Sequence, residues 1–178
     1  MKKNKGNLFV IVGPSGVGKD TLLNEIKRKL IHFHFVRRYI TRNLDKTNEN
    51  HIPISSSDFQ KKAKEGFFAI TWEAHCLSYG IPKDMDDELK KGVNVIFNGS
   101  RLALGQIKEN YPDAKIICIT ASKKIIESRL MVRNRENEAE IKKRLNRKVI
   151  KLPSDTIYVK NESDLKTGVK KLINALDY

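Results

Sequence analysis

Cysteine and long apolar segments are both scarce in this chain of 178 residues. The two cysteines, Cys76 and Cys118, are too few and too far apart for a disulfide framework, and a pair of reduced thiols suits the cytosol. The apolar run 8–12 follows a basic N-terminus but is too short for a signal peptide, and no window approaches a membrane span. We therefore expect a cytoplasmic protein that does not contact a membrane.

Acidic residues are also in short supply, because 35 lysines and arginines face 21 aspartates and glutamates, which leaves a net charge of +14. Such an excess predicts a polyanionic partner, which could be nucleic acid, acidic lipid or a small substrate with several phosphates. No basic platform interleaved with aromatic residues is present, which argues against nucleic acid. No serine-histidine-acid arrangement or carboxylate pair suggests hydrolysis. A small phosphorylated molecule is the partner that we expect.

What the chain does contain is a regular alternation of strand-like and helical patterns. The expected strands are 8–12, 34–40, 67–72, 76–79, 93–97, 115–120 and 156–159, and the expected helices are 21–31, 57–64, 83–91, 102–110, 122–133, 139–151 and 164–176. The pattern predicts an α/β fold with a parallel sheet of about five strands flanked by helices, and with functional sites at the carboxyl ends of the strands. The length suits one domain over 1–178, with a subdomain inserted at 34–80.

A glycine-rich motif follows the first expected strand. Its residues are Gly13, Pro14, Ser15, Gly16, Val17, Gly18, Lys19, Asp20 and Thr21. The spacing is that of the phosphate-binding loop G-x-x-x-x-G-K-[ST], except that Asp20 stands where a hydroxyl residue is expected. The glycines let the backbone approach a polyphosphate, which meets several N–H groups and the positive end of the following helix. We therefore predict nucleotide binding here, with Lys19 reaching the β- and γ-phosphates.

A second place where a carboxylate near magnesium is expected is the exit of the strand 93–97. Here the chain reads Asn98-Gly99-Ser100-Arg101. Phosphate-loop enzymes commonly carry an acidic residue at such a place, where it holds the water shell of magnesium, but here the residue is an amide. Asp20 could supply the missing carboxylate, because Mg²⁺ favours oxygen ligands and keeps most of its waters. It could equally be an acid that suits the N-terminus of a helix.

Two clusters of arginine could contact phosphates. The first surrounds a polar break at 134–138 and contains Arg129, Arg133, Arg135, Arg144 and Arg147. It predicts a lid over 133–151 in which Arg133 and Arg144 stabilise the transferring phosphoryl group, and the alternative is a solvated basic helix face.

The second cluster lies in the inserted subdomain and could line an acceptor site for an anion. It comprises Arg37, Arg38, Thr41 and Arg42, followed downstream by His75 and Tyr79. A metal site at His75 and Cys76 is disfavoured, because adjacent residues with no other spaced cysteine or histidine make a poor ligand set. A hydrogen bond from His75 to substrate and a plain packed histidine both stay open. His51 has no such context, so we expect no functional role for it.

Several motifs, in order along nearly the whole chain, resemble the guanylate-kinase-like group of nucleoside monophosphate kinases. They are the phosphate loop at 13–19, Ile-Thr-Arg at 40–42, Tyr-Gly at 79–80, Tyr-Pro-Asp-Ala at 111–114, and Arg129-Leu130 followed by Arg133. The resemblance implies a P-loop kinase with a core at 1–33, 81–132 and 152–178, an acceptor-binding subdomain at 34–80 and a lid that closes on ATP. The acidic guanine reader of that group has no counterpart after Phe68, where the chain reads Ala-Ile-Thr-Trp.

A closer resemblance is to the ribose 1,5-bisphosphate phosphokinase family. It is carried by Gly-Lys-Asp in the loop, Ile-Thr-Arg, Trp72-x-Ala74-His75, Tyr-Gly-Ile-Pro at 79–82 and Asn-Gly-Ser-Arg at 98–101. It implies an enzyme of phosphonate catabolism that uses ATP and Mg²⁺ to phosphorylate the anomeric phosphate of ribose 1,5-bisphosphate, giving 5-phospho-α-D-ribose 1-diphosphate (PRPP) and ADP. Such an acceptor is already anionic, so positioning and charge neutralisation can suffice without a general base.

The resemblance also implies roles for single residues. Lys19, Arg133 and Arg144 would be catalytic, and Asp20 or Thr21 would lie near magnesium. The candidates for the acceptor site are Arg38, Thr41, Arg42, His75, Tyr79, Asn98, Ser100 and Arg101. Two alternatives are a nucleoside monophosphate kinase that acts on GMP and an inactive guanylate-kinase-like binding module.

Overall fold

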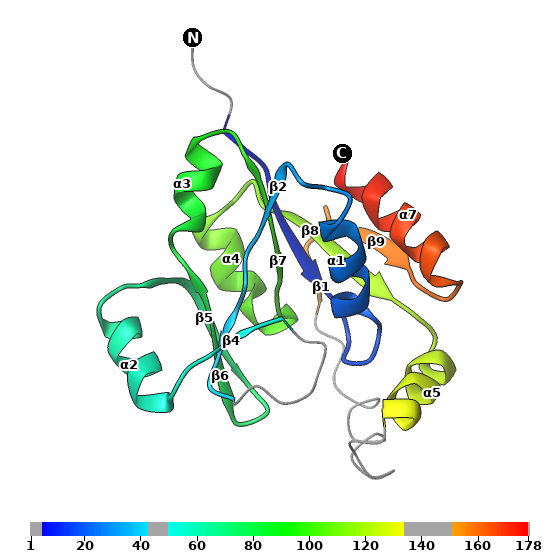
Figure 1. The fold of residues 1–178 in the computed structure, drawn as a ribbon, viewed down its shortest axis with the longest axis horizontal. Coiled ribbons are helices and arrows are strands. Elements are labelled where there is room, and N and C mark those ends of the chain that lie inside the picture. Colours follow the sequence, from blue (N-terminus) through cyan, green and yellow to red (C-terminus); the bar gives the residue numbers. More distant parts are fainter. Residues whose placement is uncertain (1–4, 43–49, 134–150, 178) are drawn as a thin grey trace.

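The structure, a computed structural model, describes residues 5–42, 50–133 and 151–177. Five of its strands form one sheet in the order β2, β7, β1, β8, β9, and every neighbouring pair runs parallel (Figure 1). These strands are β2 (Phe33–Phe35), β7 (Asn94–Asn98), β1 (Leu8–Val12), β8 (Lys115–Thr120) and β9 (Ile157–Lys160). The five-stranded parallel sheet predicted from the sequence is therefore confirmed.

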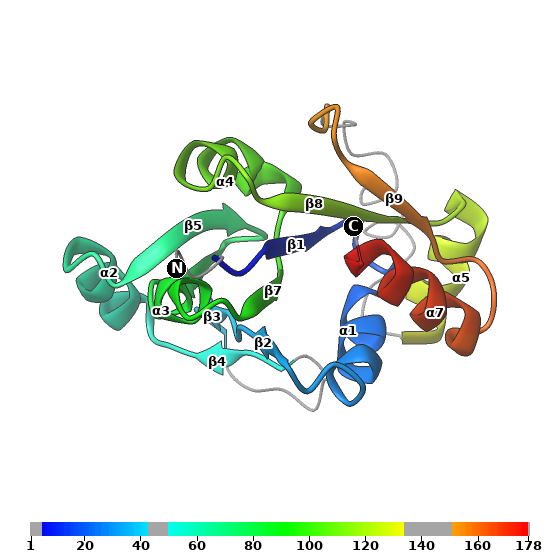
Figure 2. The ribbon, with the colours of Figure 1, turned by 90° about the horizontal axis from the view of Figure 1, so that it is seen from above.

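The central strand β1 is buried along its whole length, and its alternating side chains belong to two different hydrophobic cores. Phe9 and Ile11 pack in the core covered by α1, α5 and α7, whereas Val10 and Val12 face the core of α3, α4 and a second sheet. Figure 2 shows these helices on the two sides of the sheet. Their bounds are α1 (Lys19–Lys27), α3 (Met85–Lys90), α4 (Leu104–Asn110), α5 (Lys123–Arg133) and α7 (Leu165–Leu176).

The second sheet has four strands in the order β4, β3, β6, β5, and α2 (Ser56–Lys64) precedes β5 in the chain. Its strands are β4 (Ile52–Pro53), β3 (Tyr39–Ile40), β6 (Leu77–Pro82) and β5 (Phe68–Ala74). The sheet thus runs from Tyr39 to Pro82, close to the predicted subdomain at 34–80. The sequence predicts a single strand over 34–40, and this is wrong, because β2 pairs with β7 in the parallel sheet while β3 pairs with β6 in the second sheet.

Two further expectations need correction. Pro82, whose residue type suits a first helical turn, instead ends β6 and pairs with Phe68, so that α3 begins only at Met85. The helix expected over 102–110 opens with a short 3-10 turn, η1 (Arg101–Ala103), because the Ser100 side chain caps it by accepting from the Leu102 N–H at 3.2 Å. The basic helix expected at 139–151 lies almost entirely outside the described residues.

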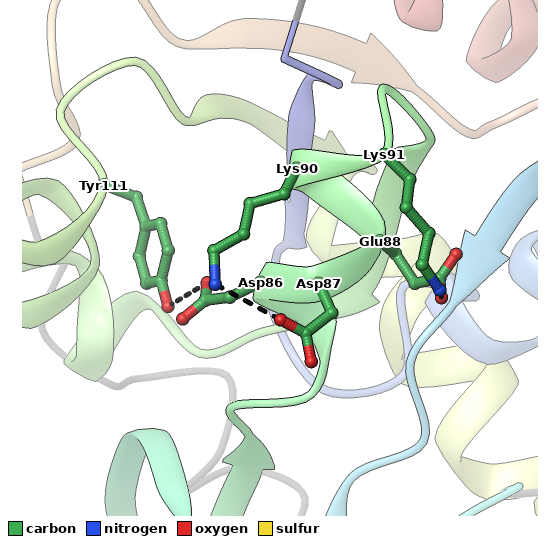
Figure 3. Close-up of polar contacts among 6 residues, drawn as sticks. All are labelled: Asp86, Asp87, Glu88, Lys90, Lys91 and Tyr111. Atoms are coloured by element: carbon green, nitrogen blue, oxygen red, sulfur yellow. Dashed lines mark hydrogen bonds and ion pairs between the residues drawn. The ribbon is translucent and has the colours of Figure 1, made fainter.

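At the amino end of the parallel sheet, a hydrogen bond joins α3 to the residue that follows α4 (Figure 3). The Tyr111 hydroxyl donates to Asp86 Oδ1 at 2.9 Å, and burial together with this carboxylate raises the pKa of the phenol above its usual range. Figure 1 places α3 at the opposite end of β1 from the β1–α1 loop. The Tyr-Pro-Asp-Ala motif at 111–114 therefore supports the fold here. No helix in the described part of the chain is long and apolar enough to cross a membrane.

Candidate active site

The loop between β1 and α1 has the backbone conformation that the phosphate-binding motif requires. Gly13, Gly16 and Gly18 have backbone φ angles of 148°, 82° and 98°. Residues other than glycine rarely adopt such positive values. A Cβ at Gly13 would collide with the Ile119 carbonyl, and one at Gly18 would lie 2.7 Å from Asn161 Nδ2. The loop is therefore packed closely against the ends of β8 and β9, with its N–H groups at the start of α1.

Lys19, the first residue of α1, is held by the loop itself. Its ammonium donates to the carbonyl oxygens of Gly13 at 2.8 Å and Pro14 at 3.0 Å. Burial lowers the pKa of Lys19 to about 8, Asp20 opposes this shift, and the positive charges of Arg38 and Arg101 add to it. Lys19 thus feels the charges of two arginines and one carboxylate, which is a net positive environment suited to phosphate.

Asp20 joins three parts of the chain. Its Oδ1 accepts a hydrogen bond from Asn98 Nδ2 at 2.6 Å and lies 3.7 Å from Arg38 Nη2. The Arg38 side chain is only 11% exposed, against 38% for Asp20. Asn98 Oδ1 is buried and has no hydrogen-bond partner among the described residues. Asp20 therefore contacts β7 and the segment between β2 and β3, and does more than suit the helix N-terminus.

Arg38 extends this contact to the second sheet. Its guanidinium carbon lies 5.9 Å from the centre of the Tyr79 ring, which stacks on Trp72 with centroids 5.2 Å apart and an interplanar angle of 5°. A cavity lined by both polar and apolar side chains opens beside α1, β2 and β7. Its polar lining residues are Asp20, Asn24, Lys27, Arg37, Arg38, Asn50 and Asn98. The loop, Arg38 and the second sheet are thus parts of one site.

The other predicted acceptor residues are placed differently. Thr41 Oγ1 accepts from the Ser78 N–H at 2.8 Å, and Ser100 caps η1, so the contacts of both side chains are with nearby backbone. His75 is exposed at the tip of the β5–β6 hairpin, where it and Cys76 have φ of 58° and 57°. Figure 1 shows this tip at the same end of the molecule as the β1–α1 loop. Arg42, at the end of the described segment 5–42, is half-buried.

The two predicted lid residues are not placed by the structure. Arg144 lies outside the described residues, and Arg133 is the last residue of α5, with a side chain that is also outside the description. Both therefore stay predictions from the sequence.

Two residues hold the loop by contacts that the sequence did not indicate: Asn161 was missed, and Arg129 was named only as a member of the arginine cluster. Asn161 Nδ2 and Arg129 Nη1 both donate to the Val17 carbonyl, at 2.8 and 3.0 Å. Asn161 directly follows β9, and its position at a strand exit is the signal that could have identified it. Arg129 belongs to the predicted arginine cluster, although the sequence favoured Arg133 and Arg144.

His51 is fully buried, and its carbonyl accepts from Arg37 Nη2 at 2.8 Å. Its Nε2 lies 3.4 Å from the Arg42 carbonyl. These contacts connect His51, the residue before β4, to both ends of the basic segment 37–42, so His51 has a supporting position that the sequence did not indicate.

Comparison with known proteins places this site in context. The AAA domain family model matches residues 10–147. The ribose 1,5-bisphosphate phosphokinase PhnN of Brucella melitensis is 38% identical over 177 residues, which cover 97% of this chain and 92% of that protein. The bifunctional ribose 1,5-bisphosphokinase-thymidine phosphorylase of Roseobacter denitrificans is 39% identical over 176 residues, which are 96% of this chain but only 26% of that protein.

Among solved structures, the guanylate kinase from Anaplasma phagocytophilum is similar with a TM-score of 0.72. The alignment covers 99% of this chain and 87% of that one, at 19% sequence identity. This likeness shows a guanylate-kinase-like P-loop fold and nothing about the substrate.

Proposed function

The chain belongs to the ribose 1,5-bisphosphate phosphokinase family, and on this premise we propose that it transfers the γ-phosphoryl group of ATP to the anomeric phosphate of ribose 1,5-bisphosphate, with PRPP and ADP as products. The observation that carries the proposal is the positive charge beside the phosphate loop, where Arg38 and Arg101 both act on Lys19 and Asp20 is the acid that opposes them. An acceptor with two phosphates and no base matches this charge. We assign the reaction to phosphonate catabolism and to the cytoplasm, where the free thiols of Cys76 and Cys118 stay reduced.

ATP fits the glycine loop, because the left-handed glycines leave no room for a Cβ and expose the backbone N–H groups at the start of α1. Lys19 would exchange its bonds to the Gly13 and Pro14 carbonyls for the β- and γ-phosphate oxygens. Its charge then stabilises the phosphoryl group in transfer.

Magnesium would be held mainly by phosphates and water. The described residues contain no group of three or more histidines, cysteines or acids that could bind a metal. The Thr21 hydroxyl and Asn98 Oδ1, which has no hydrogen-bond partner among the described residues, are suitable donors for such an ion or its waters, and Asp20 is the acid next to them. When bound, the ion neutralises charge on the β- and γ-phosphates.

The acceptor would lie between Arg38 and the strand exit at 98–101. Arg38 and Arg101 supply positive charge, and Tyr79 forms the wall on which Arg38 rests. No general base is required, because a phosphate acceptor is already an anion at neutral pH. Proximity and charge neutralisation therefore account for the chemistry.

The test is a coupled assay with ATP, in which ribose 1,5-bisphosphate and GMP are compared as acceptors and the sugar product is identified. We expect turnover of the sugar bisphosphate to PRPP. Faster turnover of GMP would show a nucleoside monophosphate kinase instead. Failure to bind ATP in a titration would show a module without kinase activity.

A further inference from the structure

Arg38 is a largely buried cation, with a side chain only 11% exposed. A buried guanidinium needs a counter-charge, because the loss of hydration is otherwise uncompensated. Asp20 supplies one such charge, because its Oδ1 lies 3.7 Å from Arg38 Nη2, within ion-pair distance. The acid that replaces a hydroxyl residue in the phosphate loop is therefore matched to an arginine of the neighbouring segment.

The same oxygen is also engaged by the Asn98 amide at 2.6 Å. A magnesium ion bound directly at Asp20 Oδ1 would compete with this amide for the same oxygen and would stand beside the Arg38 guanidinium. Both effects oppose such binding, since like charges repel in a partly desolvated site. Asp20 therefore contacts Arg38 and Asn98, which both line the cavity beside α1, and these contacts disfavour direct binding of the metal.

We propose that Asp20 is a positioning residue of the acceptor site, which holds the Arg38 guanidinium against Tyr79 so that it meets an acceptor phosphate. This inference rests on the proposed function, because it names the residue through which the loop and the acceptor site act together. It leaves Thr21 as the residue of the loop near the magnesium shell. It also predicts that Asp20 affects the acceptor more than it affects ATP.

The experiment measures KM for ribose 1,5-bisphosphate, KM for ATP and the half-saturating magnesium concentration in the full chain. In Asp20→Asn the side chain keeps its size and can still accept from Asn98, but it loses the charge that holds Arg38. We expect KM for the acceptor to rise about tenfold or more, with KM for ATP and the magnesium requirement changed less than about twofold. Asp20→Ser, which restores the usual hydroxyl, should behave in the same way.

A double-mutant cycle with Arg38→Met isolates the contact. If Asp20 acts through Arg38, the substitution Asp20→Asn has no further effect on KM for the acceptor once Arg38 is absent. The matched control is Glu25→Gln, because Glu25 is also an acid of α1 but pairs at 3.2 Å with the exposed Arg28. It should leave all three parameters unchanged.

A changed magnesium requirement with an unchanged KM for the acceptor would overturn the inference, and so would additive effects in the cycle. Circular dichroism and ATP titration establish that each variant is folded. If the wild type does not use ribose 1,5-bisphosphate, the proposed function fails, and the cycle is then measured with the acceptor that the wild type does use. The two failures are therefore distinguishable.

Discussion

Raising the pH should weaken ATP binding by removing a proton from Lys19. Burial lowers the pKa of this lysine from 10.5 to about 8 in the absence of nucleotide. The neutral amine has no charge to offer the β- and γ-phosphates. Since kcat/KM reports the free enzyme, the structure predicts that kcat/KM for ATP falls above pH 8 or so, about tenfold per pH unit.

The value of kcat should fall only at higher pH. Bound ATP places negative charge beside Lys19 and stabilises the protonated form, so the pKa of the lysine rises in the complex. The separation between the two pH profiles therefore measures how strongly the phosphates and the ammonium interact, at about 1.4 kcal/mol per unit.

Two variants of neighbouring charges and one of Lys19 itself should change the pH at which kcat/KM falls. Arg101 lowers the pKa of Lys19, so Arg101→Gln should move the fall in kcat/KM to higher pH. Asp20 raises the pKa of Lys19, so Asp20→Asn should move it to lower pH. Lys19→Arg should abolish the fall, because a guanidinium keeps its proton throughout this range.

The assay is initial-rate kinetics from pH 6.5 to about 10, at constant ionic strength, because charge interactions are screened by salt. The value of kcat/KM for ATP is taken at an acceptor concentration well below its KM, so that it reports the enzyme free of both substrates, and kcat is taken at saturating acceptor. A flat profile of kcat/KM up to about pH 9.5 would refute the argument, since Lys19 would then keep its proton. Displacements of the wrong sign in the Arg101 and Asp20 variants would refute the assigned causes.

Three further predictions concern the loop and the fold. Asn161→Ala removes the 2.8 Å hydrogen bond to the Val17 carbonyl and should raise KM for ATP by about tenfold, the cost of a buried hydrogen bond, which ATP titration measures. Cys76→Gly relieves a left-handed residue at φ 57° and should stabilise the chain by about 0.5–1 kcal/mol after the entropy of glycine is subtracted, as urea denaturation would show. Tyr111→Phe breaks the bond to Asp86 and should lower Tm by about 2–6 °C with turnover unchanged, so a loss of activity would contradict its structural role.

Most of the architecture followed from periodicity. The apolar run 8–12, the strand 115–120 and the closing helix were predicted close to their observed bounds. The two strands are apolar runs bounded by polar or turn residues, and the helix is long enough to show a helical period. The segment 34–40 was not, because a short run cannot indicate that its two halves pair with different sheets. Such pairing is decided by contacts with β7 and β6, which come much later in the chain.

The sequence alone determined where the phosphate-binding motif lies, between the first strand and the first helix, because its glycines and Lys19 are neighbours in the chain. It also linked Asp20 and Asn98, because an acid in the loop could replace the acid missing at the strand exit, but it gave no contact between the two side chains. Only the tertiary structure placed the Asn98 amide and the Arg38 guanidinium on the same oxygen of Asp20 and brought Asn161 to the loop. The physical reason is that parallel strands end at one edge of a sheet, so residues far apart in sequence meet there. Each then affects the pKa and the position of its neighbours.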